Sequence, residues 1–295
     1  MPAGLDLRII ARVTEALVQA AVYRRTVPVS LERVWENVRD WEHLPWLHAS
    51  SFGAIDFQEE GDWGWRARVT LQPEAAGNVI GIELLTDEPA LRYVTRTVEG
   101  AGRGTEIWTV LEPKDDDITD IEVQFHLPAS VGSQAPLLGQ AYVVLYAQLW
   151  DEDEAMMLSR TAELASRGDR SHDPVSFDLG PSDELRKTLP RTVDFGGHRF
   201  RIVDLEGDLV VHSASCPHWL GPLDGCEVEN GFIICPWHGY RFDARTGESA
   251  NGHKLRLAAA PRLAVDPETG RVRLESASSK PGGGPEAFHA QARFP

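Results

Sequence analysis

Cysteine is scarce in this chain, which has only three in 295 residues. So few cysteines, odd in number, exclude a fold held together by disulfide bonds and favour a reducing compartment such as the cytoplasm. Long apolar runs are also missing, since none approaches the roughly 18 residues of a membrane-spanning helix. Residues 5–22 are interrupted by four charged side chains, unlike a secretory signal. We therefore expect a cytoplasmic protein without a membrane partner.

Basic residues are outnumbered as well. The 29 Lys and Arg residues face 45 Asp and Glu residues, which gives a formal net charge of −16. So acidic a surface repels phosphate groups, which excludes nucleic acid and anionic lipid as expected partners. The apolar share of 42% and the charged share of 25% are typical of a globular protein. A length of 295 residues suits two domains.

The pattern along the chain predicts an α+β fold with two domains. Residues 1–167 are expected to form an antiparallel sheet that grips one long C-terminal helix and leaves a cavity between them. A polar linker with Gly and Pro follows at 168–175, then a nearly all-β domain at 176–276 and a flexible tail at 277–295. In the first domain the patterns predict helices at 5–18, 31–39, 41–48 and 136–167, and strands at 22–29, 52–57, 63–71, 79–85, 91–97, 105–111 and 118–127.

One motif in the second domain carries cysteine and histidine together. Cys216-Pro-His218 is followed, after sixteen residues, by Cys235-Pro-Trp-His238. Two thiolates and two neutral imidazoles can hold a [2Fe–2S] cluster with both histidines on one iron. Zinc also accepts these ligands, but zinc fingers place the two cysteines together and then the two histidines. The mixed pairs in this chain favour the cluster.

The residues around this motif closely resemble the two cluster loops of Rieske ferredoxins and Rieske oxygenases, over about residues 175–275. Cys226 lies between the loops and is not a ligand in this pattern. The respiratory type of Rieske protein has an extra cysteine in each loop, whereas the second loop here has none. The resemblance implies a one-electron carrier of the soluble type, which needs an electron donor and an acceptor.

A second constellation lies in the first domain. Glu36, Asn37, Asp40, His43 and His48 follow the spacing E-N-x2-D-x2-H-x4-H. It resembles the catalytic signature of Rieske non-haem iron oxygenases of the aromatic-ring-hydroxylating type. The resemblance implies that the two histidines bind a mononuclear Fe(II), that the aspartate lies between this iron and the cluster, and that the asparagine forms hydrogen bonds near the site. The glutamate either orients the helix or is a solvated bystander.

The same segment also fits a broader pattern. Val34-Trp35, Asp40, Pro45 and Trp46 resemble the start of START-like (SRPBCC) ligand-binding and cyclase domains. In such a protein the two histidines would be ordinary pocket or surface residues. A third metal ligand separates these alternatives, because a facial triad needs one carboxylate beside two histidines.

Asp153 is the candidate for that carboxylate. It falls on an apolar stripe of the predicted long helix, where an unpaired charge is costly. Asp151, Glu152 and Glu154 are expected to point away and to be solvated, and the alternative is a helix with a wholly acidic face. The oxygenase family also takes its carboxylate from the closing helix. The stripe consists of Tyr146, Leu149, Trp150, Met157 and Leu164.

The resemblance as a whole implies an oxygenase that uses O2 to hydroxylate or oxidatively demethylate a small apolar or aromatic substrate, with mono- and dioxygenation both open. Its electrons would come from an NAD(P)H-dependent reductase, directly or through a ferredoxin. The family implies a homo-oligomer, often a trimeric ring with the two centres facing each other across subunits. Here the catalytic domain precedes the Rieske domain, which reverses the family order and leaves open whether Asp40 acts within or between chains.

Two other functions fit the residues. One is a START-like protein that binds a hydrophobic ligand and is fused to a ferredoxin-type electron carrier, without mononuclear iron. The other is a metal-free cyclase or dehydratase that uses His43, Asp40 or His126 as acid or base. The substrate cannot be inferred, because the strand aromatics belong either to a pocket or to the core. These aromatics are Trp63, Trp65, Tyr93, Trp108 and Phe125.

Overall fold

A computed structural model describes residues 15–73, 77–166 and 176–276. The predicted linker at 168–175, the tail at 277–295 and most of the predicted first helix lie outside these ranges. No helix within them combines the length and the apolar character that a membrane span requires.

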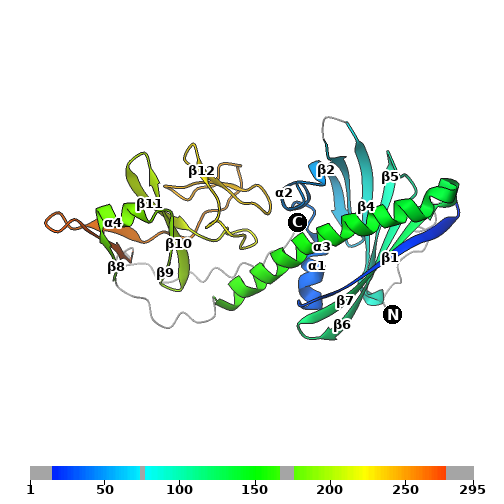
Figure 1. Cartoon of the computed structure of the whole chain (residues 1–295), viewed down its shortest axis with the longest axis horizontal. Helices are drawn as coiled ribbons and strands as arrows, with labels where there is room; N and C mark the ends of the chain where they lie inside the picture. The colour runs from blue at the N-terminus through cyan, green and yellow to red at the C-terminus, as the bar shows by residue number, and fades with distance from the viewer. Residues whose placement is uncertain (1–14, 74–76, 167–175, 277–295) are drawn as a thin grey trace.

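The first domain is a seven-stranded antiparallel sheet with one long helix, α3, lying along it (Figure 1). The strand order β1-β7-β6-β5-β4-β3-β2 is a meander that β1 closes by pairing with β7. The predicted α+β helix-grip arrangement is therefore confirmed. Its elements are β1 (Leu17–Val27), α1 (Leu31–Arg39), α2 (Leu44–Leu47), β2 (Phe52–Gly61), β3 (Gly64–Leu71), β4 (Val79–Asp87), β5 (Arg92–Glu99), β6 (Glu106–Asp115), β7 (Ile118–Pro128) and α3 (Ala135–Ser166), with short 3-10 turns at Glu88–Ala90 and Ala129–Gln134.

The first strand begins earlier than the pattern predicts. Leu17 and Val18, which were expected in a helix, pair with Pro128 and Leu127 at the end of β7. The helical prediction is wrong for these two residues. Their backbone groups form hydrogen bonds with β7, a strand about 110 residues away, which a local sequence pattern does not reveal. The strand also ends at Val27 rather than at Val29.

The segment with the aspartate and the two histidines is shaped by two short helices. Ser30 caps α1 by accepting a hydrogen bond from the Arg33 backbone N–H, and the predicted bounds of this helix are confirmed. The helix stops at Asp40, whose extended backbone turns the chain. Pro45 then falls in the first turn of α2, a position at which proline is tolerated. The result is a tight loop that holds the candidate site residues.

One substitution tests how much the core between the sheet and α3 contributes to stability. Phe125 on β7 is 0% exposed, and its ring lies 5.5 Å from that of Tyr142 and 5.1 Å from that of Tyr146. Phe125→Ala is expected to lower the free energy of unfolding by about 3–5 kcal/mol, because a cavity remains where the ring was. Urea denaturation followed by circular dichroism measures the change. Leu137→Ala on the same helix as the tyrosines is the control, since Leu137 is 75% exposed and should tolerate truncation.

The second domain consists of three small antiparallel sheets, with strand orders β11-β10-β9, β12-β13-β14 and β15-β16-β8. The strand β8 and the helix α4 open the domain, and β8 pairs with β16 at its far end. The elements are β8 (Ser176–Pro181), α4 (Ser182–Lys187), β9 (Arg191–Phe195), β10 (His198–Leu205), β11 (Asp208–Ser213), β12 (Val228–Glu229), β13 (Phe232–Ile234), β14 (Arg241–Asp243), β15 (Arg262–Val265) and β16 (Arg271–Glu275).

The long helix α3 belongs to both domains. Met157 is buried in the core between sheet and helix, whereas its neighbour Met156 is buried in the core of the second domain with Cys216 and Cys235. Adjacent residues on a helix point about 100° apart, so one helix can serve two cores. Leu47 on α2 packs against the same second-domain core, which places the second domain beside α2 (Figure 1).

Candidate metal centres

The two cysteine–histidine loops of the second domain face each other. Cys216 and Cys235 are 0% and 1% exposed, and the imidazole rings of His218 and His238 lie 4.6 Å apart. Gly221 supports this approach, because a Cβ there would come within 2.8 Å of the Cys235 sulfur. The four candidate ligands therefore lie on facing loops, with Cys216, Cys235 and His238 buried and His218 half-buried.

The donor atoms of these loops fit a metal cluster. The Nδ1 atoms of both His218 and His238 are buried without a hydrogen-bond partner, which is costly unless a metal takes the lone pair. The hydrogen bond between the two sulfur atoms raises the pKa of Cys216 and lowers that of Cys235. Metal ions remove the repulsion that prevents both thiols from ionising.

Cys226 stands apart from these ligands. Its sulfur is half-buried and lies 3.5 Å from the Pro222 carbonyl oxygen. We expect Cys226→Ser to retain the visible absorption of the cluster and Cys216→Ser to lose it, because serine is a poor substitute for a thiolate ligand. Absorption spectra and acid-labile sulfide measured on both purified variants test this difference. Loss of the cluster in the Cys226 variant would show that the ligand assignment is wrong.

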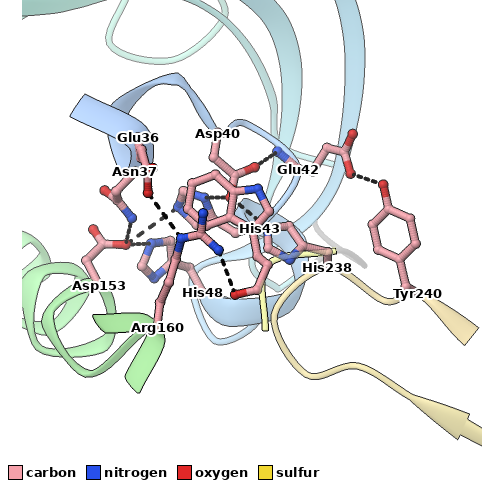
Figure 2. Close-up of polar contacts among 11 residues, drawn as sticks. Glu36, Asn37, Asp40, Glu42, His43, His48, Asp153, Arg160, His238 and Tyr240 are labelled. Carbon is pink, nitrogen blue, oxygen red and sulfur yellow. Dashed lines mark hydrogen bonds and ion pairs between the residues drawn. The ribbon is translucent and has the colours of Figure 1, made fainter. Parts of the chain in front are cut away.

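The first domain brings a second set of donors together. The Asp153 Oδ1 atom lies 3.6 Å from His43 Nε2 and 3.2 Å from His48 Nε2 (Figure 2). Donor atoms of the three buried residues all lie within 4.8 Å of one another. Two imidazoles and one carboxylate on one side of a metal are the ligands of a facial triad, which suits Fe(II). The three residues that the sequence selects therefore fit a single metal ion.

Neighbouring residues orient these donors. Asn37 on α1 donates a 2.9 Å hydrogen bond from Nδ2 to the Asp153 Oδ1 atom. Burial raises the pKa of Asp153, but His48 and then His43 outweigh this and hold the pKa below its ordinary value. Asp153 is therefore a carboxylate, as a metal ligand must be.

Glu152 corrects one prediction from the sequence. It was expected to point away from the site, but its Oε2 atom lies 2.6 Å from His48 Nδ1. Glu152 does not belong to the apolar stripe of α3, but its side chain is long enough to reach His48 from the neighbouring face of the helix. Asp151 and Glu154 do point elsewhere, and both pair with Arg25 rather than standing alone in solvent.

A single aspartate connects the two sets of donors. The Asp40 Oδ2 atom lies 2.6 Å from His238 Nε2 and 3.3 Å from His43 Nδ1, within one chain (Figure 2). Burial raises the pKa of Asp40, but the hydrogen bond from His238 and then the contact with His43 outweigh it, so the pKa lies below its ordinary value. The carboxylate oxygen only accepts hydrogen bonds, which places the imidazole proton of His238 on Nε2 and leaves the lone pair of its Nδ1 atom for metal. His43 Nδ1 lies near the same carboxylate without a hydrogen bond, and its Nε2 atom faces Asp153.

A cavity of about 120 Å³ adjoins the first-domain donors. Two of the strand aromatics considered from the sequence, Trp65 and Tyr93, line it and also belong to the core, and Tyr146 on α3 lines it as well. Burial raises the pKa of both phenols, so they stay protonated and can donate hydrogen bonds. The full lining is Asn37, Val38, Asp40, His43, Leu44, His48, Phe52, Trp65, Ile82, Leu84, Tyr93, Thr95, Tyr146, Leu149, Trp150 and Asp153.

Four residues considered from the sequence lie away from this cavity. Phe125 is in the core, and Trp63 is not part of the cavity lining. Trp108 donates a hydrogen bond to Glu106, and its ring lies beside that of His126. His126 therefore does not face the cavity in which an acid or base would act.

Comparison with known proteins identifies the second domain. Residues 176–260 match the family model of the Rieske [2Fe-2S] domain. The protein therefore contains a Rieske domain, which supports a [2Fe–2S] cluster and a redox function. No curated protein matches the sequence.

Three solved structures that are similar to parts of this chain each cover half of it or less. The ferredoxin of carbazole 1,9a-dioxygenase from Nocardioides aromaticivorans is 24% identical, with 35% of this chain and 99% of that chain covered and a TM-score of 0.30. The ZhuI aromatase/cyclase from Streptomyces sp. R1128 is 16% identical, with 50% and 96% covered and a TM-score of 0.39. Norcoclaurine synthase from Thalictrum flavum is 18% identical, with 50% and 98% covered and a TM-score of 0.40.

Proposed function

We propose that the protein is an oxygenase in which a Rieske cluster serves a mononuclear Fe(II) in the helix-grip domain. The observation that carries this proposal is the Asp40 carboxylate, which contacts both His238 of the cluster loop and His43 of the first-domain triad. A carrier fused to an unrelated binding domain has no need of a buried charged link between the two. The proposed reaction is O2-dependent hydroxylation, or demethylation through hydroxylation, of a small apolar or aromatic molecule.

The proposed iron ligands are Cys216, His218, Cys235 and His238 for the cluster, with His43, His48 and Asp153 for the mononuclear Fe(II). When bound, the mononuclear iron supplies open coordination positions for O2, and the cluster supplies electrons one at a time. Three buried donors of this kind in an apolar cavity are better explained by a metal ion than by a ligand pocket that needs no charge.

Other residues of the chain orient the proposed metal ligands and limit the access of water to them. Glu152 fixes the proton of His48 on Nδ1, Asp40 lies beside His43 Nδ1, and Asn37 holds Asp153. The donor residues His43, His48 and Asp153 are buried, so bulk water has little access to them and their electrostatic contacts are stronger than in solvent.

The cavity also limits the size of the proposed substrate. Apolar cavities of roughly 150 Å³ bind molecules the size of benzene, so about 120 Å³ favours a small compound unless the walls move. The phenol groups of Tyr93 and Tyr146 could donate hydrogen bonds to one polar group on that compound.

An external reductant is part of the proposal, because a [2Fe–2S] cluster passes one electron at a time. The proposed partner is an NAD(P)H-dependent reductase, acting directly or through a ferredoxin. Assembly into a homo-oligomer such as a trimer remains a separate proposal from the family resemblance.

Isotope labelling tests the reaction. The reduced protein, loaded with iron, is mixed with 18O2 and a panel of small aromatic and N- or O-methylated compounds. Mass spectrometry should find a product with 18O, or formaldehyde when a methyl group is removed, and Cys216→Ser should give neither. If the panel compounds bind, the cluster is reduced and no oxygen atom is ever transferred, a ligand-binding protein fused to an electron carrier would be the better description.

A further inference from the structure

The helix α3 presents one face to both centres. Asp153, Met156, Arg160 and Glu163 are spaced three, four and three residues apart, which places them along one side of the helix. Asp153 faces the first-domain histidines, whereas Met156 is buried among the residues that surround Cys216 and Cys235. A single continuous helix therefore supports both candidate metal centres.

Arg160 connects this helix to the first cluster loop. Its Nη1 atom donates a 3.2 Å hydrogen bond to the carbonyl oxygen of Trp219, the residue after His218. Its guanidinium group also lies 4.6 Å from the centre of the Trp219 ring. The Arg160 Nε atom donates a 3.1 Å hydrogen bond to Glu36 on α1, so this one side chain of α3 contacts two other segments (Figure 2). Glu36 thus holds the arginine that contacts the first cluster loop and is not a solvated bystander.

Glu163 holds the same loop from its other side. Its Oε2 atom accepts a 2.9 Å hydrogen bond from the hydroxyl of Ser215, the residue before Cys216. Its Oε1 atom lies 3.7 Å from Arg199 on β10. The loop is therefore anchored to α3 on both sides of its two ligands.

The second cluster loop is held by the segment around α2. Tyr240 donates a 2.9 Å hydrogen bond to Glu42, two residues beyond Asp40. The ring of Trp46 packs so closely on Gly239 that a Cβ there would lie 2.0 Å from the ring. Both ligand-bearing loops are thus fixed to the first domain of their own chain, at points that flank the Asp40 contact.

We propose that each chain completes the link between its own two centres, so that a neighbouring subunit is not needed for it. This rests on the proposed function only for the identity of the metals. Packing and hydrogen bonds at both loops position His238 beside Asp40 within the chain. The family resemblance implied instead that the two centres meet across subunits, and the reversed domain order is the feature that permits the difference.

Cross-linking of the full chain distinguishes the two arrangements without relying on activity. Glu42→Cys and Tyr240→Cys are combined in a Cys226→Ser background, with the cluster loaded so that its cysteines are protected. A short bis-maleimide reagent should then join the two cysteines within one chain. Denaturing electrophoresis and peptide mapping should find a cross-linked product with the mass of one chain. Covalent dimers or larger products joined at residues 42 and 240 would overturn the proposal.

A mixture of the two single variants is the matched control. Glu42→Cys and Tyr240→Cys chains, refolded or coexpressed together, should give no cross-linked dimer, since each chain then carries only one cysteine of the pair. A second pair, Glu163→Cys with Arg199→Cys, probes the other side of the first loop if the first pair disturbs folding. It should again link within one chain, and links between chains would contradict the account. Neither result depends on whether oxygen is transferred, so failure of the proposed function is recognised separately.

Discussion

Asp40→Asn is expected to reduce product formation by about 100-fold while both iron centres stay loaded, because partners that orient metal ligands typically contribute 10–100-fold. Asparagine keeps the size of the side chain but removes the negative charge that His238 and His43 face. An amide can also present an N–H group to these imidazoles, which disturbs the placement of their protons. Reduction of the cluster by dithionite should remain normal, and turnover with iron analysis of the same sample measures the difference.

Glu42→Gln is the matched control for that substitution. Glu42 is two residues away and binds Tyr240 of the same cluster loop, but it contacts neither candidate ligand set directly. Its effect on turnover should be small by comparison. Near-normal turnover in Asp40→Asn would remove the basis for a link through this carboxylate and would favour the fused-carrier alternative.

Asp153→Ala is expected to abolish turnover and to leave the cluster spectrum unchanged. Among the residues that the structure describes, Asp153 is the carboxylate whose oxygen faces the Nε2 atoms of both His43 and His48, and two histidines alone leave too few donors for Fe(II). Asp151→Ala should retain activity, because the Asp151 side chain is 70% exposed and pairs with Arg25. Turnover assays with visible and EPR spectra of both variants make the comparison. Equal losses at positions 151 and 153 would show that the wrong carboxylate had been chosen.

Much of the fold could be predicted because its signals are local. The bounds of α1 follow from the Ser30 cap and the turn at Asp40, and each meander strand is bounded by turn residues. The elements that were missed depend on distant partners. The strand β8 is stabilised by β16, which lies about ninety residues further along the chain, and α4 has only six residues. A short window of sequence around β8 does not show that a distant strand will pair with it.

The candidate sites show the same division. The spacing of Cys216, His218, Cys235 and His238 is a local signature, and it located a domain that the family model also matches. Asp153 could be found because a charge on an apolar stripe is anomalous. Glu152 was misjudged because helical periodicity describes where a side chain starts and not how far it reaches. Arg160 lies seven residues after Asp153 on the same face, a signal that was present and unused.

The meeting of Asp40 with His238 had no local signal. These residues are 198 positions apart, and their contact depends on how two domains pack. The resemblance to an oxygenase family predicted the contact but implied that it forms between subunits. Contacts of Met156, Glu163 and Trp46 with the second domain, none of which a motif describes, place it within one chain.

The iron content of the anaerobically prepared protein tests the central claim most directly. A cluster plus a mononuclear site requires about three irons and two acid-labile sulfides per chain. His43→Ala should lower the iron to about two per chain and leave the sulfide unchanged, since only the mononuclear site loses a ligand. A wild-type protein that holds about two irons for two sulfides, with no loss in His43→Ala, would contradict the account.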